Sequence, residues 1–159
     1  MTRLDEFISR LTAQRDILNH VAARGDLPPG PVLEIGLGNG RTYSHLKFLF
    51  PDRRIIAFDR AVGAHTTCLP KPADTVLGDI RETTVAMAGC KAALAHVDIG
   101  TGYPERDAFI RGWLPERVQA MVATGGFVAS GLDLQHDRLI ELPRLPTVDE
   151  GRYFLYRKE

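Results

Sequence analysis

A carboxylate followed by three glycines at alternate positions stands out in the segment VLEIGLGNGRT, residues 32–42. The acid is Glu34, and the glycines are Gly36, Gly38 and Gly40. Glycine lets a ligand approach the backbone closely, and backbone amides exposed in this way attract negative groups such as phosphate. A neighbouring carboxylate has the opposite effect. The segment therefore predicts a small-molecule site whose ligand can lie against exposed backbone amides and also beside a carboxylate.

Two phosphate-binding motifs fit this segment poorly. A P-loop requires four residues between its glycines and then a lysine, whereas Gly36 and Gly40 are one residue too close and Arg41 follows. A dinucleotide-binding loop requires G-x-G-x-x-G after a strand, and here the third glycine comes one position early. A phosphate charge about 5–6 Å from Glu34 also costs about 3 kcal/mol at an effective dielectric constant near 20. A cationic ligand is therefore favoured over a phosphorylated one.

S-Adenosylmethionine is a ligand of this kind, because it carries two positive centres, a sulfonium and an α-ammonium group, beside an adenosine. The segment resembles the first motif of class I S-adenosylmethionine-dependent methyltransferases, an acid-x-G-x-G-x-G sequence after the first strand. The resemblance covers about residues 30–130. It implies a cofactor site that includes Glu34, Gly36, Leu37, Gly38, Asn39, Gly40 and Thr42.

A second carboxylate, Asp59, ends the apolar stretch RIIAFDR and lies 19 residues beyond Gly40. At this distance from a glycine loop, a carboxylate can accept hydrogen bonds from both hydroxyl groups of a ribose. Without the glycine loop, Asp59 would be interpreted as an ordinary residue of the turn after a strand. We therefore predict that Asp59, with its neighbour Arg60, contributes to the ribose side of the cofactor site.

Asp79 occupies the corresponding place after the third strand, in VLGDI. The resemblance implies that its carboxylate binds the exocyclic amine of adenine and that the amide of Ile80 meets a ring nitrogen. An alternative from the residues alone is that Asp79 caps the helix that begins near Glu82. Both roles remain open from the sequence.

Asp98 ends the fourth strand in AHVDIGTGY. The resemblance implies that this position faces the amino end of the cofactor or the substrate, so Asp98 and Tyr103 are the candidates for a general base. One branch of the superfamily binds metal through an H-[IV]-D-x-x-H-x-Y run, but Thr101 stands where its second histidine would fall, and no metal is expected. His96 lies on the same side of the strand as Asp98 and is expected to be a hydrogen-bonded core histidine.

Composition limits the partners. Lys plus Arg equals Asp plus Glu at 20 each, whereas a protein that binds a phosphate backbone normally has a basic excess. No apolar run approaches the roughly 18 residues that span a bilayer. The first residues, MTRLDEFISR, carry charge where a secretory signal is apolar, and the two cysteines form no C-x-x-C pair. We expect a cytoplasmic protein with reduced thiols and with no nucleic-acid or membrane partner.

The elements that must position these acids follow from the hydrophobic pattern. Apolar strand-like runs alternate with helical ones, which predicts a mostly parallel, doubly wound sheet covered on both faces. The ligand crevice of such a sheet lies at the carboxyl ends of its strands. The predicted strands are residues 32–35, 55–58, 75–77, 93–99 and 126–130.

Helices are predicted between these strands. The amphipathic helix 3–24 begins at a capping pair, Thr2 and Asp5, and stops at Gly25. Gly112 and Pro115 should divide the last predicted helix. The other predicted helices are residues 43–50, 81–90 and 104–126.

The tail departs from this alternation. Seven residues separate Ser130 from RLIELPRL, residues 138–145, which is too few for a helical crossover. RLIELPRL and GRYFLYRK, residues 151–158, are expected to pair as an antiparallel hairpin through PTVDEG. The whole chain, residues 1–159, is thus predicted to be a single domain in which residues 1–27 form an N-terminal helix packed on the core.

The predicted function is transfer of the sulfonium methyl group to a small-molecule acceptor. Leu132, Leu134 and residues 143–146 are candidates to line the acceptor site, and the same apolar groups could instead form a homodimer contact. Two alternatives stay open at this point. One is a non-catalytic S-adenosylmethionine-binding module for sensing or interaction, and the other is a small NAD-dependent oxidoreductase.

Overall fold

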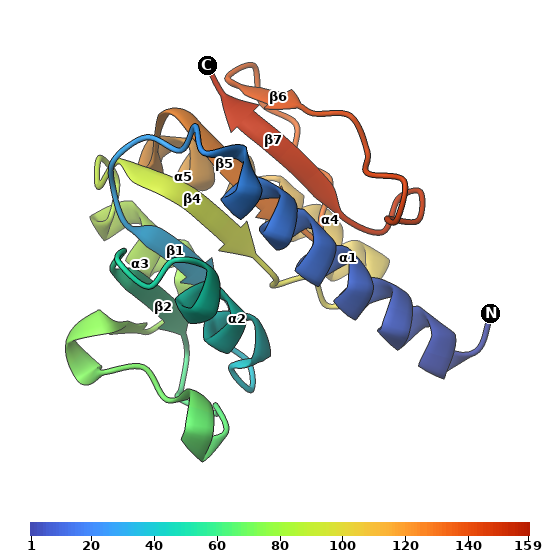
Figure 1. Cartoon of the computed structure of the whole chain (residues 1–159), viewed down its shortest axis with the longest axis horizontal. Helices are drawn as coiled ribbons and strands as arrows, with labels where there is room; N and C mark the ends of the chain where they lie inside the picture. Colours follow the sequence, from blue (N-terminus) through green and yellow to red (C-terminus); the bar gives the residue numbers. More distant parts are fainter.

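Seven strands form one sheet in the order β3-β2-β1-β4-β5-β7-β6 (Figure 1). This computed structural model describes all residues, 1–159. The first five strands are parallel, and β7 and β6 are antiparallel to their neighbours, which confirms the predicted sheet with its C-terminal hairpin. The strands are β1 (Val32–Ile35), β2 (Ile55–Asp59), β3 (Thr75–Leu77), β4 (Ala92–Val97), β5 (Val122–Ser130), β6 (Leu139–Glu141) and β7 (Phe154–Lys158).

Helices cover both faces of the sheet because successive strand residues point to opposite sides. Val32 packs in the core that α1 and α2 cover, whereas the next residue, Leu33, packs in the core of α5. The predicted doubly wound arrangement is therefore confirmed. The helices are α1 (Arg3–Arg24), α2 (Arg41–Leu49), α3 (Ile80–Ala86), α4 (Pro104–Arg111) and α5 (Leu114–Met121).

The long helix α1 is fixed at both ends as the sequence predicts. The Thr2 hydroxyl accepts a hydrogen bond from the Asp5 amide, the Asp5 carboxylate accepts one from the Thr2 amide, and Gly25 ends the helix in the left-handed conformation with φ 72°. Leu18 is fully buried against the sheet, whereas Leu4 is 65% exposed. The first turns of α1 extend beyond the body of the molecule (Figure 1).

The region after α4 differs partly from the prediction. Helix α4 ends at Arg111 and α5 begins at Leu114, which confirms the division near Gly112 and Pro115. The predicted helix over 104–126 is wrong beyond Met121, because β5 already begins at Val122. Val122 pairs with Ala92 of β4, and this pairing outweighs the local helical pattern.

The connections before β3 and after β5 contain little regular structure. Two short 3₁₀ turns, η1 (Thr66–Cys68) and η2 (Pro72–Asp74), replace a helix between β2 and β3. No helix lies between β5 and β6, as predicted. Leu132 and Leu134 are 5% and 2% exposed in the α5 core, so the prediction that they line the acceptor site is wrong. None of the helices combines the length and apolar character that crossing a membrane requires.

The contrast between two leucines of α1 tests this packing. Leu18→Ala should lower the free energy of unfolding by about 2–5 kcal/mol, because it leaves a cavity between α1 and the sheet. Leu4→Ala should change it by less than about 0.5 kcal/mol, because that side chain is mostly in solvent. Urea unfolding followed by circular dichroism measures both, and equal losses would contradict the placement of α1.

Candidate active site

A cleft of about 400 Å³ opens at the carboxyl end of β1, where the strand order reverses between β2 and β4. Ligands of doubly wound sheets bind at this place. One wall is the loop between β1 and α2, and the opposite wall is α1. The lining consists of Phe7, Arg10, Leu11, Gln14, Gly36, Leu37, Gly38, Asn39, Arg41, Thr42, Asp59, Ile80, Asp98 and Ile99.

The three glycines of the loop have different structural roles. Gly36 has φ 93°, and a Cβ there would lie 2.5 Å from the Asp98 carbonyl oxygen, so only glycine lets β1 pass β4. Gly38 has φ 53° and open space where a Cβ would be, so its backbone is bare toward the cleft. Gly40 does not line the cleft. A Cβ at Gly40 would lie 2.7 Å from the Cβ of Cys68, which brings the β2–β3 connection against the loop.

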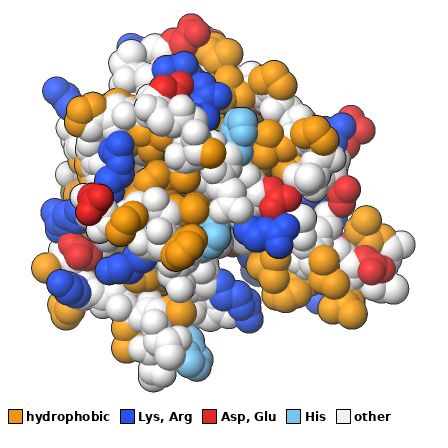
Figure 2. Space-filling view, in the orientation of Figure 1, with side chains coloured by type: hydrophobic (Ala, Val, Ile, Leu, Met, Phe, Trp, Pro, Cys, Tyr) orange, Lys and Arg blue, Asp and Glu red, His pale blue; other side chains and the backbone are white.

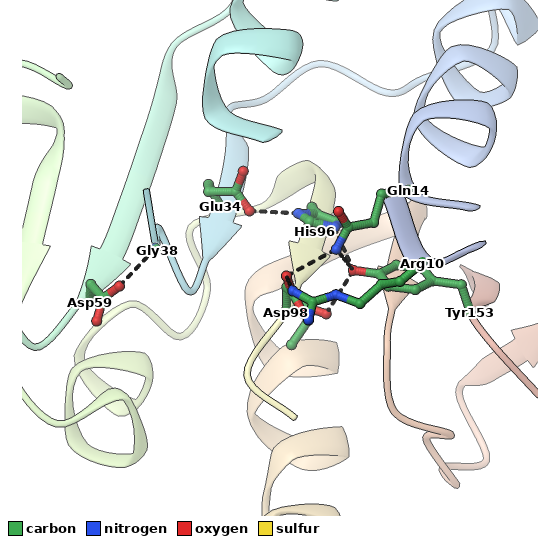
Figure 3. A network of polar contacts seen from close by, with 9 residues as sticks. Arg10, Gln14, Glu34, Gly38, Asp59, His96, Asp98 and Tyr153 are labelled. Atoms are coloured by element: carbon green, nitrogen blue, oxygen red, sulfur yellow. Dashed lines mark hydrogen bonds and ion pairs between the residues drawn. The ribbon is translucent and has the colours of Figure 1, made fainter. Parts of the chain in front are cut away.

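Asp59 fastens the glycine loop to the end of β2. Its Oδ2 accepts a hydrogen bond from the Gly38 amide at 3.0 Å, and its Oδ1 accepts one from the Arg60 amide at 2.7 Å (Figure 3). The carboxylate also lines the cleft. Asp59 is therefore placed beside the bare backbone of Gly38, and its contact with ribose hydroxyls stays a prediction.

A second cavity of about 650 Å³ continues from the cleft, because Ile80 and Ile99 line both. Arg60 and Asp79 also line it. Asp79 Oδ1 accepts a hydrogen bond from the Arg81 amide at 2.9 Å and caps α3, which confirms the capping alternative. Capping uses one oxygen only, so the predicted contact of Asp79 and Ile80 with adenine remains compatible with this geometry.

Glu34 does not reach the cleft. It is fully buried, and its Oε1 lies 2.5 Å from His96 Nδ1 on the neighbouring strand β4 (Figure 3). The other ring nitrogen of His96 lies 2.6 Å from the hydroxyl oxygen of Tyr153, just before β7. His96 is thus the hydrogen-bonded core histidine that the sequence predicts. The chain of contacts joins β1, β4 and the C-terminal hairpin at the cleft end of the sheet.

The charge of Glu34 is opposed by this pairing. Burial alone would lower the pKa of His96, but the Glu34 carboxylate, with a smaller contribution from Asp98, opposes burial and raises the pKa above its usual value. A protonated ring donates from both nitrogens, to Glu34 and to Tyr153. Glu34 therefore does not favour a cationic ligand in the cleft. The negative charges that favour one are those of the two carboxylates that line the cleft, Asp59 and Asp98.

Asp98 connects this buried chain to α1. Its Oδ2 accepts hydrogen bonds from Arg10 at 2.7 Å and from Gln14 at 2.9 Å, both on α1 (Figure 3). The same Gln14 amide nitrogen lies 3.3 Å from the Tyr153 hydroxyl oxygen. The N-terminal helix is thereby held over the cleft through side chains that line it.

Other predicted candidates lie elsewhere. Tyr103 is 62% exposed at the start of α4, where Arg106 stacks on its ring, and it lines neither cavity. The structure therefore does not bring Tyr103 together with Asp98. Pro143 lines a separate cavity of about 340 Å³ under the C-terminal hairpin. No cluster of three His, Cys, Asp or Glu side chains is arranged to hold a metal ion.

Sequence reasoning missed the α1 wall and Tyr153. A signal for the wall existed, because Gln14 stands next to Ala13 on the buried side of an amphipathic helix, where a polar residue needs a partner. For Tyr153 no local signal existed. It contacts His96 across 57 residues of chain, through the antiparallel position of β7.

The cleft fits S-adenosylmethionine. At Gly38 a side chain would fill the space that a ligand needs, and the bare backbone there lies beside the Asp59 carboxylate. Asp98 supplies a second carboxylate on the far side of the loop. These groups match a ribose and an ammonium group, whereas a pyrophosphate would meet both carboxylates.

Comparisons with known proteins agree with this fit. A family model described as "S-adenosyl-L-methionine methyltransferase" matches residues 1–158. The crystal structure of an S-adenosyl-L-methionine methyl transferase from Silicibacter pomeroyi DSS-3 has 40% sequence identity, covers 100% of this chain and 99% of that chain, and has a TM-score of 0.92. No curated protein matches the chain.

Two more distant structures share the fold alone. A TehB-like SAM-dependent methyltransferase from Corynebacterium glutamicum has 13% identity and a TM-score of 0.59, with 92% of this chain and 88% of that chain covered. The antibiotic-resistance methyltransferase Kmr has 16% identity and a TM-score of 0.54, with 91% and 92% covered. Both matches extend over most of each chain.

The buried pair predicts a specific pH dependence. In Glu34→Gln the pKa of His96 should fall, because burial then acts without the opposing carboxylate of Glu34. An NMR titration of the imidazole resonances measures this. His45 is an internal control, because burial and Arg15 lower its pKa and neither changes in the variant.

Stability should follow the same protonation. A raised folded-state pKa stabilises the protein fully below the unfolded value near 6.5, and this stabilisation is lost as the pH rises through the folded-state pKa. The difference in free energy of unfolding between the wild type and Glu34→Gln should therefore shrink at alkaline pH. A difference that is constant with pH would show that His96 is neutral.

Gly38→Ala tests the bare backbone. The variant should weaken S-adenosylmethionine binding by about tenfold or more, which corresponds to about 1.4 kcal/mol, because the methyl group enters the cleft. Gly25→Ala is the matched control: Gly25 also has positive φ and open space, but it ends α1 away from the cleft. Both should lose about 1 kcal/mol of stability from backbone strain. Calorimetric titration showing equal affinities would contradict the placement of the site.

Proposed function

The chain belongs to the S-adenosyl-L-methionine methyltransferase family, and we propose that its methyl acceptor is a small molecule bound between α1 and the glycine loop. S-Adenosylmethionine is its methyl donor. One observation carries the proposal: α1 of the same chain walls the cleft opposite the glycine loop and limits it to about 400 Å³, a space that the acceptor must share with part of the cofactor. Small-molecule sites commonly have volumes of about 300–1,000 Å³.

The cofactor would be held by the residues at the carboxyl ends of the strands. We propose that the glycine loop receives the methionine part, that Asp59 and Arg60 lie at the ribose, and that Asp79 and Ile80 lie at the adenine. Glu34 acts indirectly, because its contact with His96 fixes the end of β1 against β4. The two connected cavities provide a continuous path for this placement.

The chemistry requires mainly positioning from the protein. Bound S-adenosylmethionine supplies a methyl group that is already activated by a cationic sulfur. Holding two reactants in line can lower the barrier by about 7–11 kcal/mol, and the α1 wall is suited to hold the acceptor. Where the acceptor arrives protonated, Asp98 is the proposed base. Arg10 and Gln14 both bond its Oδ2, which leaves Oδ1 as the oxygen to accept the proton.

Family membership removes the two alternatives that the sequence left open, a non-catalytic binding module and an oxidoreductase. No nucleic-acid or membrane partner is proposed, and on the face shown in Figure 2 basic and acidic side chains are interspersed rather than gathered into one basic patch. A cytoplasmic location is proposed because Cys68 and Cys90 are free thiols.

The sequence placed a possible homodimer contact at Leu132, Leu134 and residues 143–146, but the two leucines are buried, and a homodimer is proposed instead through the exposed start of α1. Hydrophobic side chains gather there at the lower right of Figure 2, and they include Met1, Leu4, Phe7 and Ile8. Analytical ultracentrifugation would detect such a dimer.

Fractionated cell extract tests the acceptor class. The protein, given S-adenosylmethionine, should form the demethylated product when the small-molecule filtrate is added and not with the retained macromolecules. Mass spectrometry measures that product. Gly38→Ala, with its weakened cofactor binding, serves as the negative control. Turnover with the macromolecular fraction alone would refute the proposed function.

A further inference from the structure

A groove between α1 and α2 extends the cleft away from the cofactor side. Its volume is about 200 Å³, and it shares Leu11, Gln14, Arg41 and Thr42 with the cleft. Because four residues line both, a ligand can lie in the cleft and continue into the groove. Of the residues predicted to bind the cofactor, only Thr42 lines the groove.

The groove is lined by basic groups and by no acidic one. Arg41, Arg15 and His45 line it. Arg15 is paired with Asp16 at 2.8 Å, whereas Arg41 has no carboxylate within ion-pair distance. Burial lowers the pKa of His45, and the charge of Arg15 lowers it further, as expected beside a cationic groove.

Arg41 is held in position without being neutralised. Its guanidinium lies 5.6 Å from the centre of the Phe7 ring on α1. With the Asn39 amide turned so that its oxygen faces Arg41, that oxygen accepts hydrogen bonds from both terminal nitrogens at 2.8 and 2.9 Å. An aromatic face and a neutral oxygen orient the side chain but leave its charge unopposed.

The two carboxylates of the cleft lie outside the groove. Asp98 is paired with Arg10, whereas Asp59 accepts hydrogen bonds from the neutral Gly38 and Arg60 amides and keeps its charge on the ribose side of the cleft. Among the residues that line both the cleft and the groove, the only charged side chain is that of Arg41. A guanidinium in a fixed orientation matches the paired oxygens of a carboxylate or phosphate.

We propose that the methyl acceptor carries an anionic oxygen group, a carboxylate or a phosphate, which Arg41 binds where the cleft meets the groove between α1 and α2. This proposal rests on the proposed small-molecule acceptor. The anionic group lies toward the groove, and the methyl-accepting atom lies in the cleft on the side of Asp98. Arg41 is then a specificity-determining residue that contacts the substrate.

Anion exchange of the small-molecule filtrate tests the charge. The compound that supports turnover should bind an anion-exchange resin at neutral pH and elute with salt. Treatment of the eluate with phosphatase before the assay separates the two sources of charge: loss of turnover indicates a phosphate, and retained turnover indicates a carboxylate.

Substitution of Arg41 tests its role. With the active fraction as substrate, Arg41→Gln should raise KM by about tenfold or more, because a charge-assisted hydrogen-bonded pair is lost. Arg41→Lys keeps the charge without the planar fork and should have an intermediate KM. Lys47→Gln removes an exposed cation from the same helix, outside the cleft and the groove, and should leave KM unchanged. Calorimetry with S-adenosylmethionine should give the same affinity for all four proteins.

The outcomes separate the two proposals. Turnover in the unretained fraction would overturn the anionic acceptor and leave the small-molecule acceptor standing. A loss of S-adenosylmethionine affinity in Arg41→Gln with an unchanged acceptor KM would also overturn it, by assigning Arg41 to the cofactor. Absence of turnover in every small-molecule fraction would refute the proposed function itself, and the anionic acceptor with it.

Discussion

The charged contact between Glu34 and His96 determines how the cleft is assembled. The two residues are direct partners in the register of β1 and β4, and both are fully buried. A buried charge without its partner is strongly unfavourable, so this contact fixes the two strands at the point where the sheet opens. Tyr153, just before β7, bonds His96 and so links the pair to the C-terminal hairpin. Gln14 of α1 bonds both Tyr153 and Asp98, which links the pair to α1. Four separate parts of the chain are therefore positioned by one hydrogen-bonded chain.

Several strands and the glycine loop could be predicted from the sequence because their signals are local. Apolar runs predicted β1 and β3 to the residue, and glycine spacing indicated the loop between β1 and α2. The start of β5 was not accessible. Residues 122–125 continue a helical pattern, and only pairing with β4 makes Val122 extended. Strand pairing is a long-range interaction, so local propensity cannot reveal it.

In the candidate site, too, residues with local signals were predicted and residues that depend on tertiary packing were not. Asp59 and Asp98 were identified because an acid at a strand end needs only the strand and the loop to be recognised. The side chains on α1 were not identified, because their position over the cleft depends on how the helix packs, and the partner of Glu34 depends on strand register. The pairing with His96 also changes what Glu34 does: it supports the loop from beneath rather than giving the ligand a net negative charge.

Both margins of the sheet are strands of only three residues, β3 and β6. Few unpaired amide and carbonyl groups are therefore offered to a strand of another molecule. Pairing of edge strands between molecules, by which sheets grow into aggregates, is therefore disfavoured. Any self-association of this enzyme must instead use helical or loop surfaces, and such contacts could form and dissolve while the hydrogen-bond ladder of the sheet stays intact.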